Sequence, residues 1–283
     1  MKLTSRFPYP FIWRRASSYV ALLMVSVFIA LPIAWLILTS LKKSTEYLTY
    51  PIVIWPKIIQ WINYNQVFSI IPFWKYAAQT LYLAATYSIL CMLSSSMAGF
   101  AFARVRAPGR AKWFAVILAL MIIPGIVTVI PQFVVFSRLH LTNTYWPWIL
   151  WGLTASPFQI FLFRQFFASI PKELEDAAEI DGCNLYRTYW QVFLPNAKPV
   201  LATSFIFSFS YVWGDWFTPM IYLSDQNTTL AVKLASAYVD PQGNQLVPTT
   251  LAACVIYMLP MVIMFFFAQK YIMAGAIRSG IKG

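Results

Sequence analysis

Charge is scarce in this sequence, and acidic charge is the scarcest. Only nine of the 283 residues are acidic and 11% are charged, whereas 60% are hydrophobic. Soluble globular domains carry about 25% charged and roughly 45–50% apolar residues. A core of this size cannot bury so many apolar side chains, so the composition excludes a soluble domain and predicts that much of the chain faces lipid. It also excludes an intrinsically disordered chain.

Cysteine and histidine are similarly few. The three cysteines are too scattered for a disulfide framework or a CxxC metal site. Two of them lie in apolar runs, where cysteine usually packs as a small apolar residue. The single histidine, His140, has no company of metal-ligating residues in the sequence around it. We therefore expect no metal site.

Catalytic and nucleotide-binding motifs are absent as well. The sequence contains no HExxH or GxSxG motif, and Gly214-Asp215 lacks the preceding glycine of the intramembrane aspartyl protease motif. It contains no GxxxxGK[ST] phosphate-binding loop, and too few residues lie outside the apolar stretches to build a nucleotide-binding domain. The sequence thus argues against an intramembrane enzyme, and we expect no cofactor to bind to this chain.

What the sequence has instead is long stretches without charge. A helix needs about 20 apolar residues to cross the hydrocarbon layer, and six stretches approach or exceed that length, although Asp215 interrupts the fifth. We therefore expect an all-α polytopic membrane protein with six transmembrane helices. The expected spans lie at about 16–41, 76–103, 113–137, 145–163, 200–223 and 249–269. Pro124, Gly125 and Pro131 are expected to break or bend the third span, as a gating hinge or as an ordinary kink.

The basic residues indicate the orientation of these spans. The formal net charge is +12, and with a cytoplasmic N-terminus 15 of the 21 basic residues lie inside and 6 outside. The positive-inside rule then places both termini in the cytoplasm, with residues 1–15 as a cytoplasmic segment and residues 16–283 as the membrane domain. A nucleic-acid surface would need a basic patch on a soluble face. No soluble segment is long enough, so we expect contact with membrane lipid and not with nucleic acid.

Most of the acidic residues gather in one place. Five of the nine fall within nine positions of the expected cytoplasmic loop 165–198. Pro171 and these acids suit the first turns of a helix, and Gly182 can take the left-handed conformation that ends it. Asn184 can then cap a second helix. The acidic residues are Glu173, Glu175, Asp176, Glu179 and Asp181.

Both expected helices carry an apolar face. The face of the first consists of Leu174, Ala177 and Ala178. The stripe of the second consists of Leu185, Tyr189, Val192 and Phe193. Pro195 and Pro199 are expected to end the second helix. A solvated acidic connector would show the same run of charge, whereas the caps and the small residues indicate a docking element with faces that the membrane part does not need.

The same loop carries a spaced motif. Asp176-Ala177-Ala178 is followed by Gly182 and then by Val192-Phe193-Leu194-Pro195. This pattern resembles the EAA motif of binding-protein-dependent ABC importer permeases, which reads Glu-Ala-Ala, three residues, Gly, nine residues, Ile, any residue, Leu-Pro. Every spacing agrees, and the two departures, Asp176 for Glu and Val192 for Ile, are conservative.

Other segments resemble the carbohydrate branch of that family, in particular the second, shorter maltose permease subunit. They are Leu38-Thr39-Ser40-Leu41-Lys42, Gly99-Phe100-Ala101-Phe102-Ala103-Arg104, Ile123-Pro124-Gly125 with Pro131, Leu141-Thr142-Asn143-Thr144-Tyr145 and Trp213-Gly214-Asp215-Trp216-Phe217. The C-terminal Ser279-Gly280-Ile281-Lys282-Gly283 is similar to the family's Gly-Ala-Val-Lys-Gly ending. Gly214-Asp215 departs from the family's usual Asn-Glu pair.

The resemblance implies the type I ABC importer permease fold and a non-catalytic, multi-pass subunit of the bacterial cytoplasmic (inner) membrane. Its function would be the ATP-driven, binding-protein-dependent import of an oligosaccharide or sugar derivative. A second permease subunit would complete the translocation path as a heterodimer. Two ATPase subunits would bind ATP and magnesium, and a periplasmic or lipid-anchored solute-binding protein would deliver the sugar.

The resemblance also implies roles for particular residues. Coupling to the ATPase would involve Glu175, Asp176, Ala177, Ala178, Asp181, Gly182, Leu194 and Pro195. A C-terminal tail would reach the ATPases through Gly280, Ile281, Lys282 and Gly283, although a frayed end is the default for a terminus. An outer loop tip would face the binding protein with Asp240, Pro241, Gln242, Gly243 and Asn244, although an ordinary connector has the same turn residues.

Candidates for lining a sugar path are Ser204, Ser208, Tyr211 and Asp215. Hydroxyls and aromatic faces suit sugars, and an intramembrane acid is a functional hypothesis by default. A carboxylate near the outer interface would instead be hydrated, and an aromatic belt explains the nearby tryptophans as well. A channel or secondary transporter would show several intramembrane charges or an internal repeat, and the sequence has neither. An importer of another solute class stays open, and neutral oligosaccharides, glycerol phosphate and uronate oligosaccharides all fit.

Overall fold

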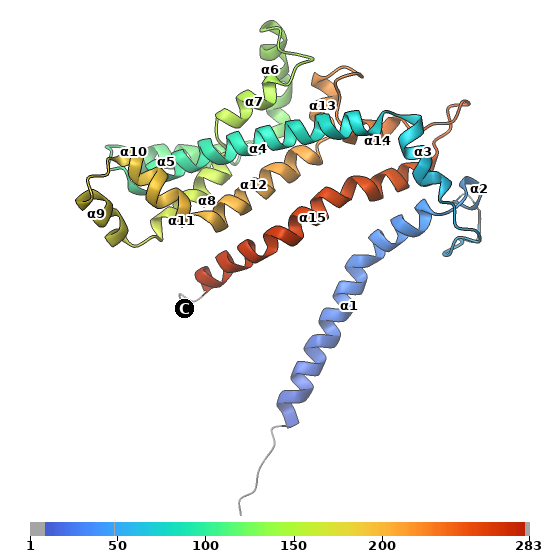
Figure 1. The fold of residues 1–283 in the computed structure, drawn as a ribbon, viewed down its shortest axis with the longest axis horizontal. Coiled ribbons are helices and arrows are strands. Elements are labelled where there is room, and N and C mark those ends of the chain that lie inside the picture. The colour runs from blue at the N-terminus through green and yellow to red at the C-terminus, as the bar shows by residue number, and fades with distance from the viewer. Residues whose placement is uncertain (1–8, 48, 281–283) are drawn as a thin grey trace, which may run out of the picture. The chain divides into compact units, whose positions relative to one another are not determined.

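The repeating elements of the protein are helices. The computed structural model describes the backbone of residues 9–47 and 49–280 and the side chains of residues 16–47 and 49–270. Within these ranges the extended pairing is limited to an isolated bridge between Val239 and Gln245, so the expected all-α class is confirmed. The elements, drawn in Figure 1, are α1 (Tyr9–Ser40), α2 (Ser44–Tyr47), α3 (Ile62–Ile70), α4 (Phe73–Arg104), α5 (Arg110–Leu120), α6 (Gly125–Arg138), α7 (Trp146–Leu153), α8 (Pro157–Ala168), α9 (Lys172–Ile180), α10 (Leu185–Arg187), the π-helix η1 (Thr188–Phe193), α11 (Leu194–Asn196), α12 (Lys198–Trp213), α13 (Phe217–Tyr222), α14 (Leu230–Ser236) and α15 (Val247–Gly280).

Three helices are each long and apolar enough to cross a membrane. They are α1 over Ala16–Ser40, α4, and α15 over Val247–Lys270, and they agree with the expected first, second and sixth spans. Two bent pairs pass the same test together, α5 with α6 at 95° and Leu185–Asn196 with α12 at 81°. The described residues therefore hold three spans, or up to five if each bent pair is one span, and the expected number of six is not confirmed.

The expected fourth span, 145–163, is divided into α7 and α8. Ala155 lies between them with a φ of 62°, in the left-handed region that favours glycine. Ser156 precedes Pro157 in an extended conformation. A proline disfavours the helical conformation in the residue before it, so an apolar stretch that looks continuous in the sequence is broken at this point.

Breaks also divide the third and fifth expected spans. Pro124 precedes α6 in an extended conformation and has no N–H to continue a helix, which confirms the predicted break there. Between α12 and α13 the break is made by Asp215, whose Oδ1 accepts hydrogen bonds from the backbone N–H groups of Phe217 and Thr218, both at 3.0 Å. A side chain that caps in this way begins a new helix.

The chain divides into two compact units, residues 1–71 with 238–257 and residues 72–237 with 258–283. In the first unit, polar contacts hold the turn after α1. The Nδ2 of Asn63 donates to the carbonyls of Ser40 and Lys42, at 2.8 and 2.9 Å. The Nζ of Lys42 donates to the carbonyl of Val53 at 2.6 Å, and burial lowers the pKa of this amine. The turn is therefore fixed by buried polar groups that find partners.

In the second unit, α4 is the central helix and contacts α7, α8 and α12 (Figure 1). Its buried face has small residues that let neighbouring helices approach closely. They include Ala84, Ser88, Cys91, Ser95, Ser96 and Gly99. A Cβ atom added at Gly99 would lie 2.4 Å from the Cβ of Phe163, so only glycine fits where α4 meets α8.

Hydrogen bonds between side chains and backbone reinforce this packing. Ser94 Oγ donates to the carbonyl of Gly152 at 2.8 Å, and Ser95 Oγ accepts the backbone N–H of Ser156 at 2.9 Å. Interhelical hydrogen bonds between membrane helices contribute about 0.6 kcal/mol each. They hold the ends of α7 and α8 against α4 at the point where the expected fourth span breaks.

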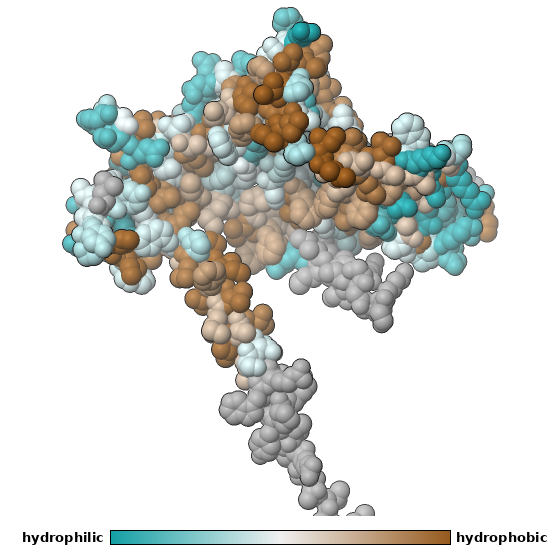
Figure 2. Space-filling model, turned by 180° about the vertical axis from the view of Figure 1, so that it is seen from behind, coloured by the Kyte–Doolittle hydropathy of each residue, from teal (hydrophilic) through white to brown (hydrophobic). Residues whose placement is uncertain are grey.

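Apolar side chains cover α1. Tyr19 is 70% exposed and Phe28 is 73% exposed, and Figure 2 shows hydrophobic residues over the described part of this helix. A surface this apolar needs lipid or another chain around it. The exposed apolar surface of α1 thus agrees with a membrane protein.

Candidate functional site

The acidic segment forms the predicted helix and turn. Pro171 precedes α9, and Glu173 and Glu175 lie in its first turn. Gly182 has a φ of +77°, and the N–H groups of Gly182 and Cys183 bond to carbonyls in the last turn of α9. This is the Schellman arrangement that glycine favours. The Oδ1 of Asn184 accepts the backbone N–H of Arg187 at 2.9 Å, so the predicted cap of the second helix is also confirmed.

Arg104, the last residue of α4, holds α9 in place. Its Nη1 pairs with Glu175 Oε2 at 3.2 Å. Its Nε and Nη2 donate to the carbonyl of Phe167, at 3.2 and 2.7 Å, and Nη2 also donates to the carbonyl of Ile170. The Arg104 and Glu175 side chains are 11% and 27% exposed. One arginine therefore joins the end of α4, the end of α8 and the first turn of α9.

This contact sorts the predicted coupling residues into two groups. Glu175 points into the unit and Ala178 is 4% exposed. The outward group consists of Asp176, Ala177, Asp181, Gly182 and Pro195, while Leu194 is half-buried. Ile180, which the motif does not include, is 87% exposed beside them. The outer face of α9 therefore combines carboxylates with exposed apolar side chains.

The second helix differs from the prediction in two ways. It runs from Leu185 to Asn196 as α10, η1 and α11, and Pro195 lies within α11 instead of ending it. Two residues of the apolar stripe are not free for docking either, because Tyr189 and Phe193 are 3% and 0% exposed, whereas Leu185 is 51% exposed.

Aromatic packing is the physical reason for that burial. The ring centroid of Phe100 lies 5.3 Å from that of Tyr189 and 4.9 Å from that of Phe193. The hydroxyls of Tyr189 and Ser96 lie 2.5 Å apart. Aromatic pairs at such distances are favourable beyond the area they bury, so this helix is an integral part of the second unit.

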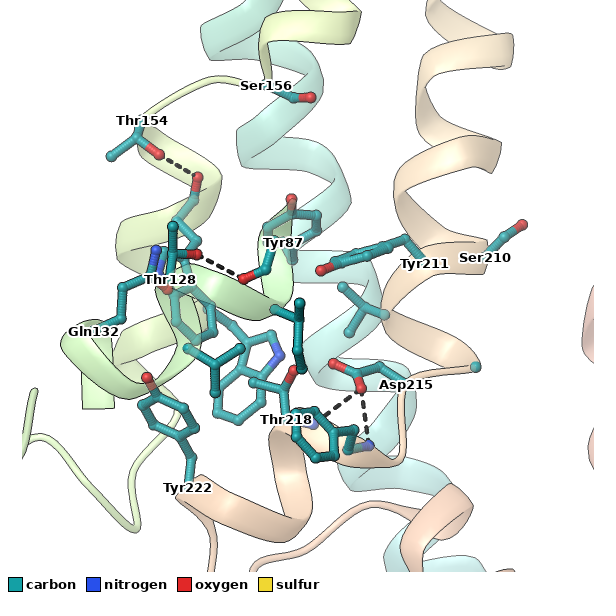
Figure 3. A pocket seen from close by; sticks show the side chains of 18 of the residues that line it. Tyr87, Thr128, Gln132, Thr154, Ser156, Ser210, Tyr211, Asp215, Thr218 and Tyr222 are labelled. Carbon is teal, nitrogen blue, oxygen red and sulfur yellow. Dashed lines mark hydrogen bonds between the residues drawn. The ribbon is translucent and has the colours of Figure 1, made fainter. Parts of the chain in front are cut away.

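A cavity of about 690 Å³ lies in the same unit, at the breaks between helices (Figure 3). Its walls come from α4, α6, α7, the turn between α7 and α8, and the α12–α13 junction. The polar and aromatic lining residues include Tyr87, Thr128, Gln132, Trp148, Trp151, Thr154, Ser156, Ser210, Tyr211, Asp215, Trp216, Thr218 and Tyr222. The ring centroids of Tyr87 and Tyr211 are 6.3 Å apart, with their planes at 35°. This combination of rings, hydroxyls and one acid can bind a polar organic molecule.

The predicted path-lining residues separate into two pairs. Tyr211 and Asp215 line the cavity. Ser204 and Ser208 are 0% and 2% exposed and lie outside it. Ser204 Oγ donates to Gln159 Oε1 at 2.6 Å, and Gln159 Nε2 donates to Ser208 Oγ. These two hydroxyls bond α12 to α8.

The sequence reasoning missed Tyr87, Thr128 and Gln132, which the cavity brings together from α4 and α6. A signal was present for Gln132, which is a polar residue in an apolar span just after Pro131. For Tyr87 there was none, because tyrosines are common at many depths of membrane helices.

The predicted outer loop tip is an ordered turn. Asp240 Oδ1 accepts the backbone N–H groups of Gln242 and Asn244, at 3.0 and 2.7 Å, and Oδ2 accepts the Asn244 side-chain amide at 3.0 Å. These bonds, above all those from Asn244, hold the pKa of the Asp240 carboxyl below its usual range. Gly243 has a φ of +85°, and the backbone of Pro241 lies within the turn.

Two further predictions concern the C-terminus and metals. Of the predicted tail, Ile281, Lys282 and Gly283 lie outside the described residues, and Gly280 is the last residue of α15. In the part of the chain that the structure describes, no three His, Cys, Asp or Glu residues gather as metal ligands.

Curated relatives match along almost the whole chain. The arabinooligosaccharides transport system permease protein AraQ of Halalkalibacterium halodurans is 32% identical over 275 residues, which is 96% of both chains. The protein of the same name from Bacillus subtilis is 32% identical over 92% of this chain and 93% of its own. The diacetylchitobiose uptake system permease protein NgcG of Streptomyces coelicolor is 30% identical over 94% and 88%.

A solved structure and a family model agree with these relatives. The structure is described as a bacterial ABC transporter involved in the import of the acidic polysaccharide alginate. A chain of it superimposes with a TM-score of 0.80 at 23% identity, over 95% of this chain and 100% of that one, which supports the fold. Residues 92–277, which include most of the cavity wall and all of α9, match the model described as binding-protein-dependent transport system inner membrane component. This chain belongs to that family of ABC transporter permeases.

Proposed function

We propose that this chain is a transmembrane permease subunit of an ATP-driven importer of an oligosaccharide or sugar derivative. Relatives over nearly the whole length are named for arabinooligosaccharides and for diacetylchitobiose, and another for melibiose, raffinose and stachyose. Three names from one chemical class favour that class over amino acids or inorganic ions. The chain would span the bacterial cytoplasmic (inner) membrane several times, with six spans, both termini in the cytoplasm and the bent pairs lining the path.

The observation that carries the coupling part of this proposal is α9. Its outer face exposes Asp176, Ala177 and Ile180, a mixture of acid and apolar surface that suits a groove on a partner. Its inner face is tied by Glu175 to Arg104 at the end of α4. A force applied to α9 is therefore transmitted directly to the central helix of the second unit. Docking of a partner ATPase at this face would turn nucleotide-driven closure into movement of α4.

The remaining parts of the assembly come from partners. A second permease subunit would supply the other half of the path, and two ATPase subunits would hold ATP and magnesium. A solute-binding protein would meet the Asp240–Asn244 turn, which internal hydrogen bonds keep in one shape. The C-terminal Gly280–Gly283 would reach the ATPases. The cavity would be a binding site for the sugar on its path from the binding protein to the cytoplasm.

The test is the sugar-stimulated ATP hydrolysis of the reconstituted complex. Gly182→Val puts a β-branched residue at a φ of +77°, which misdirects the turn after α9 at a cost of about 1–2 kcal/mol. Asp176→Lys reverses a charge on the exposed face. Both should abolish stimulation and leave membrane insertion intact.

The matched control is Gly182→Asn, because asparagine tolerates the left-handed conformation. It should retain stimulation close to that of the wild type. Normal stimulation in Gly182→Val and Asp176→Lys would contradict the coupling role of this segment.

A further inference from the structure

The cavity of the second unit has one charge in its wall. Its 21 lining residues all belong to the described part of the chain, and Asp215 is the only Asp, Glu, Lys, Arg or His among them. The other polar groups are hydroxyls of Ser, Thr and Tyr, the amide of Gln132 and the indoles. On the side that this chain contributes, a solute inside therefore meets uncharged groups and a single acid.

The carboxylate is fixed in direction. Its Oδ1 accepts the N–H groups of Phe217 and Thr218, and Figure 3 shows Asp215 between Tyr211 and Thr218 at the cavity. With Oδ1 used by the backbone, Oδ2 is the oxygen able to accept hydroxyls of a bound molecule. Bonds from hydroxyls to a carboxylate are among the stronger hydrogen bonds, and the Tyr87 and Tyr211 rings offer apolar faces beside it.

The wall contains no cationic side chain that would bind an anion. Carboxylate groups are bound in proteins by arginine, lysine or clustered N–H donors, and the backbone N–H groups at the start of α13 already bond to Asp215. A cavity of about 690 Å³ is small enough to keep a bound uronate within roughly 10 Å of that acid. At the effective dielectric constant of about 20 that suits such sites, the repulsion disfavours the anion about tenfold or more.

We propose that Asp215 makes this cavity a binding site for uncharged oligosaccharides and excludes uronate oligosaccharides. The inference rests on the proposed function and narrows its substrate class.

The test uses the complete complex of both permeases and the ATPase subunits, in lipid nanodiscs without the binding protein. Equilibrium dialysis measures the binding of radiolabelled arabinotriose, galactotriose and trigalacturonate, the last two differing at C6 of each ring. The wild type should bind an uncharged trisaccharide at least about tenfold more tightly than trigalacturonate. Added salt should shrink this ratio, because it screens the repulsion.

Asp215→Asn isolates the charge. Asparagine keeps an Oδ1 that can cap α13, so the fold is retained. The variant should lower the ratio about tenfold, chiefly through tighter binding of trigalacturonate. Gln132→Glu adds a second acid to the wall and should raise the ratio. Glu46→Gln, outside the cavity in α2, is the matched control and should leave the ratio unchanged.

An unchanged ratio in Asp215→Asn would overturn the proposal that Asp215 excludes uronate oligosaccharides. The complex could bind none of the three sugars although loaded binding protein stimulates its ATPase. That result would contradict the proposed sugar site in the cavity and leave the proposed importer function standing. A wild-type complex that loaded binding protein does not stimulate would count against the importer function itself, whatever the dialysis shows.

Discussion

The contact between Arg104 and Glu175 allows a quantitative prediction about α9. We expect Arg104→Met to detach the first turn of α9 from the end of α4, because methionine replaces the apolar stem of arginine but has no charge and no donor. Glu175→Gln removes only the ion pair. The two single variants and the double variant form a cycle that separates the pair from the other bonds of Arg104.

The structure sets the expected magnitudes. The Arg104 side chain is 11% exposed, so its loss leaves the carbonyls of Phe167 and Ile170 without their donor, at about 1–3 kcal/mol. Glu175 is 27% exposed, so water weakens the ion pair and its coupling energy should be about 1 kcal/mol. We therefore expect about 2–3 kcal/mol for Arg104→Met and about 1 kcal/mol for Glu175→Gln.

Hydrogen exchange of the α9 amides in the reconstituted complex measures these costs. A loss of 2 kcal/mol corresponds to about thirtyfold faster exchange through local opening, and stimulated ATP hydrolysis should fall in the same order of variants. Lys172→Met is the control, because the ion pair of Lys172 with Asp176 at 3.4 Å is more than half exposed on both sides and should contribute little. Equal exchange rates of the α9 amides in wild type and Arg104→Met would refute the idea that Arg104 holds α9 in place.

Two further predictions concern other parts of the fold. Gly99→Ala places a Cβ 2.4 Å from the Cβ of Phe163. It should lower the stability of the unit by about 1–3 kcal/mol, measured by thermal unfolding in detergent. The control is Gly125→Ala, which has nothing within 4 Å of its added Cβ and should not lower the stability; equal losses in the two variants would contradict the close contact of α4 and α8. The pKa of Asp240 lies below its usual range, so the carboxylate stabilises its turn above the unfolded pKa and this contribution is lost as pH falls through the folded pKa. Carbon NMR of labelled aspartate should show that low pKa, and Asn244→Ala should raise it; an unchanged pKa in that variant would show that the bonds from Asn244 do not lower it.

The long apolar helices and the local caps could be predicted from sequence. The spans at α1, α4 and α15 follow from charge-free runs, and the caps at Gly182 and Asn184 follow from residues whose preferences are local. The broken spans could not be predicted fully. The break at Pro124 was visible, and Pro157 is an equally visible signal for the break at Ala155. The bonds by which Ser94 and Ser95 hold that turn against α4 depend on packing.

The predicted site residues show the same division. The spaced motif located the segment that α9 forms, but it could not say which residues face outward. Glu175 turns inward because its carboxylate accepts a hydrogen bond from Arg104, which lies 71 positions earlier in the sequence. Ser204 and Ser208 look like path residues in the sequence. In the structure their hydroxyls form hydrogen bonds with the side chain of Gln159 between α12 and α8.

The sequence by itself determined that this chain is an all-helical membrane protein and located its acidic helix and the turn after it. Hydropathy, charge and capping act over a few neighbouring residues, so they can be read along the chain. Only the tertiary structure decided which acid is paired and which faces the cavity. Burial and Coulomb interactions depend on distances in space, and Arg104, Glu175, Tyr87 and Asp215 meet their neighbours only after the helices pack.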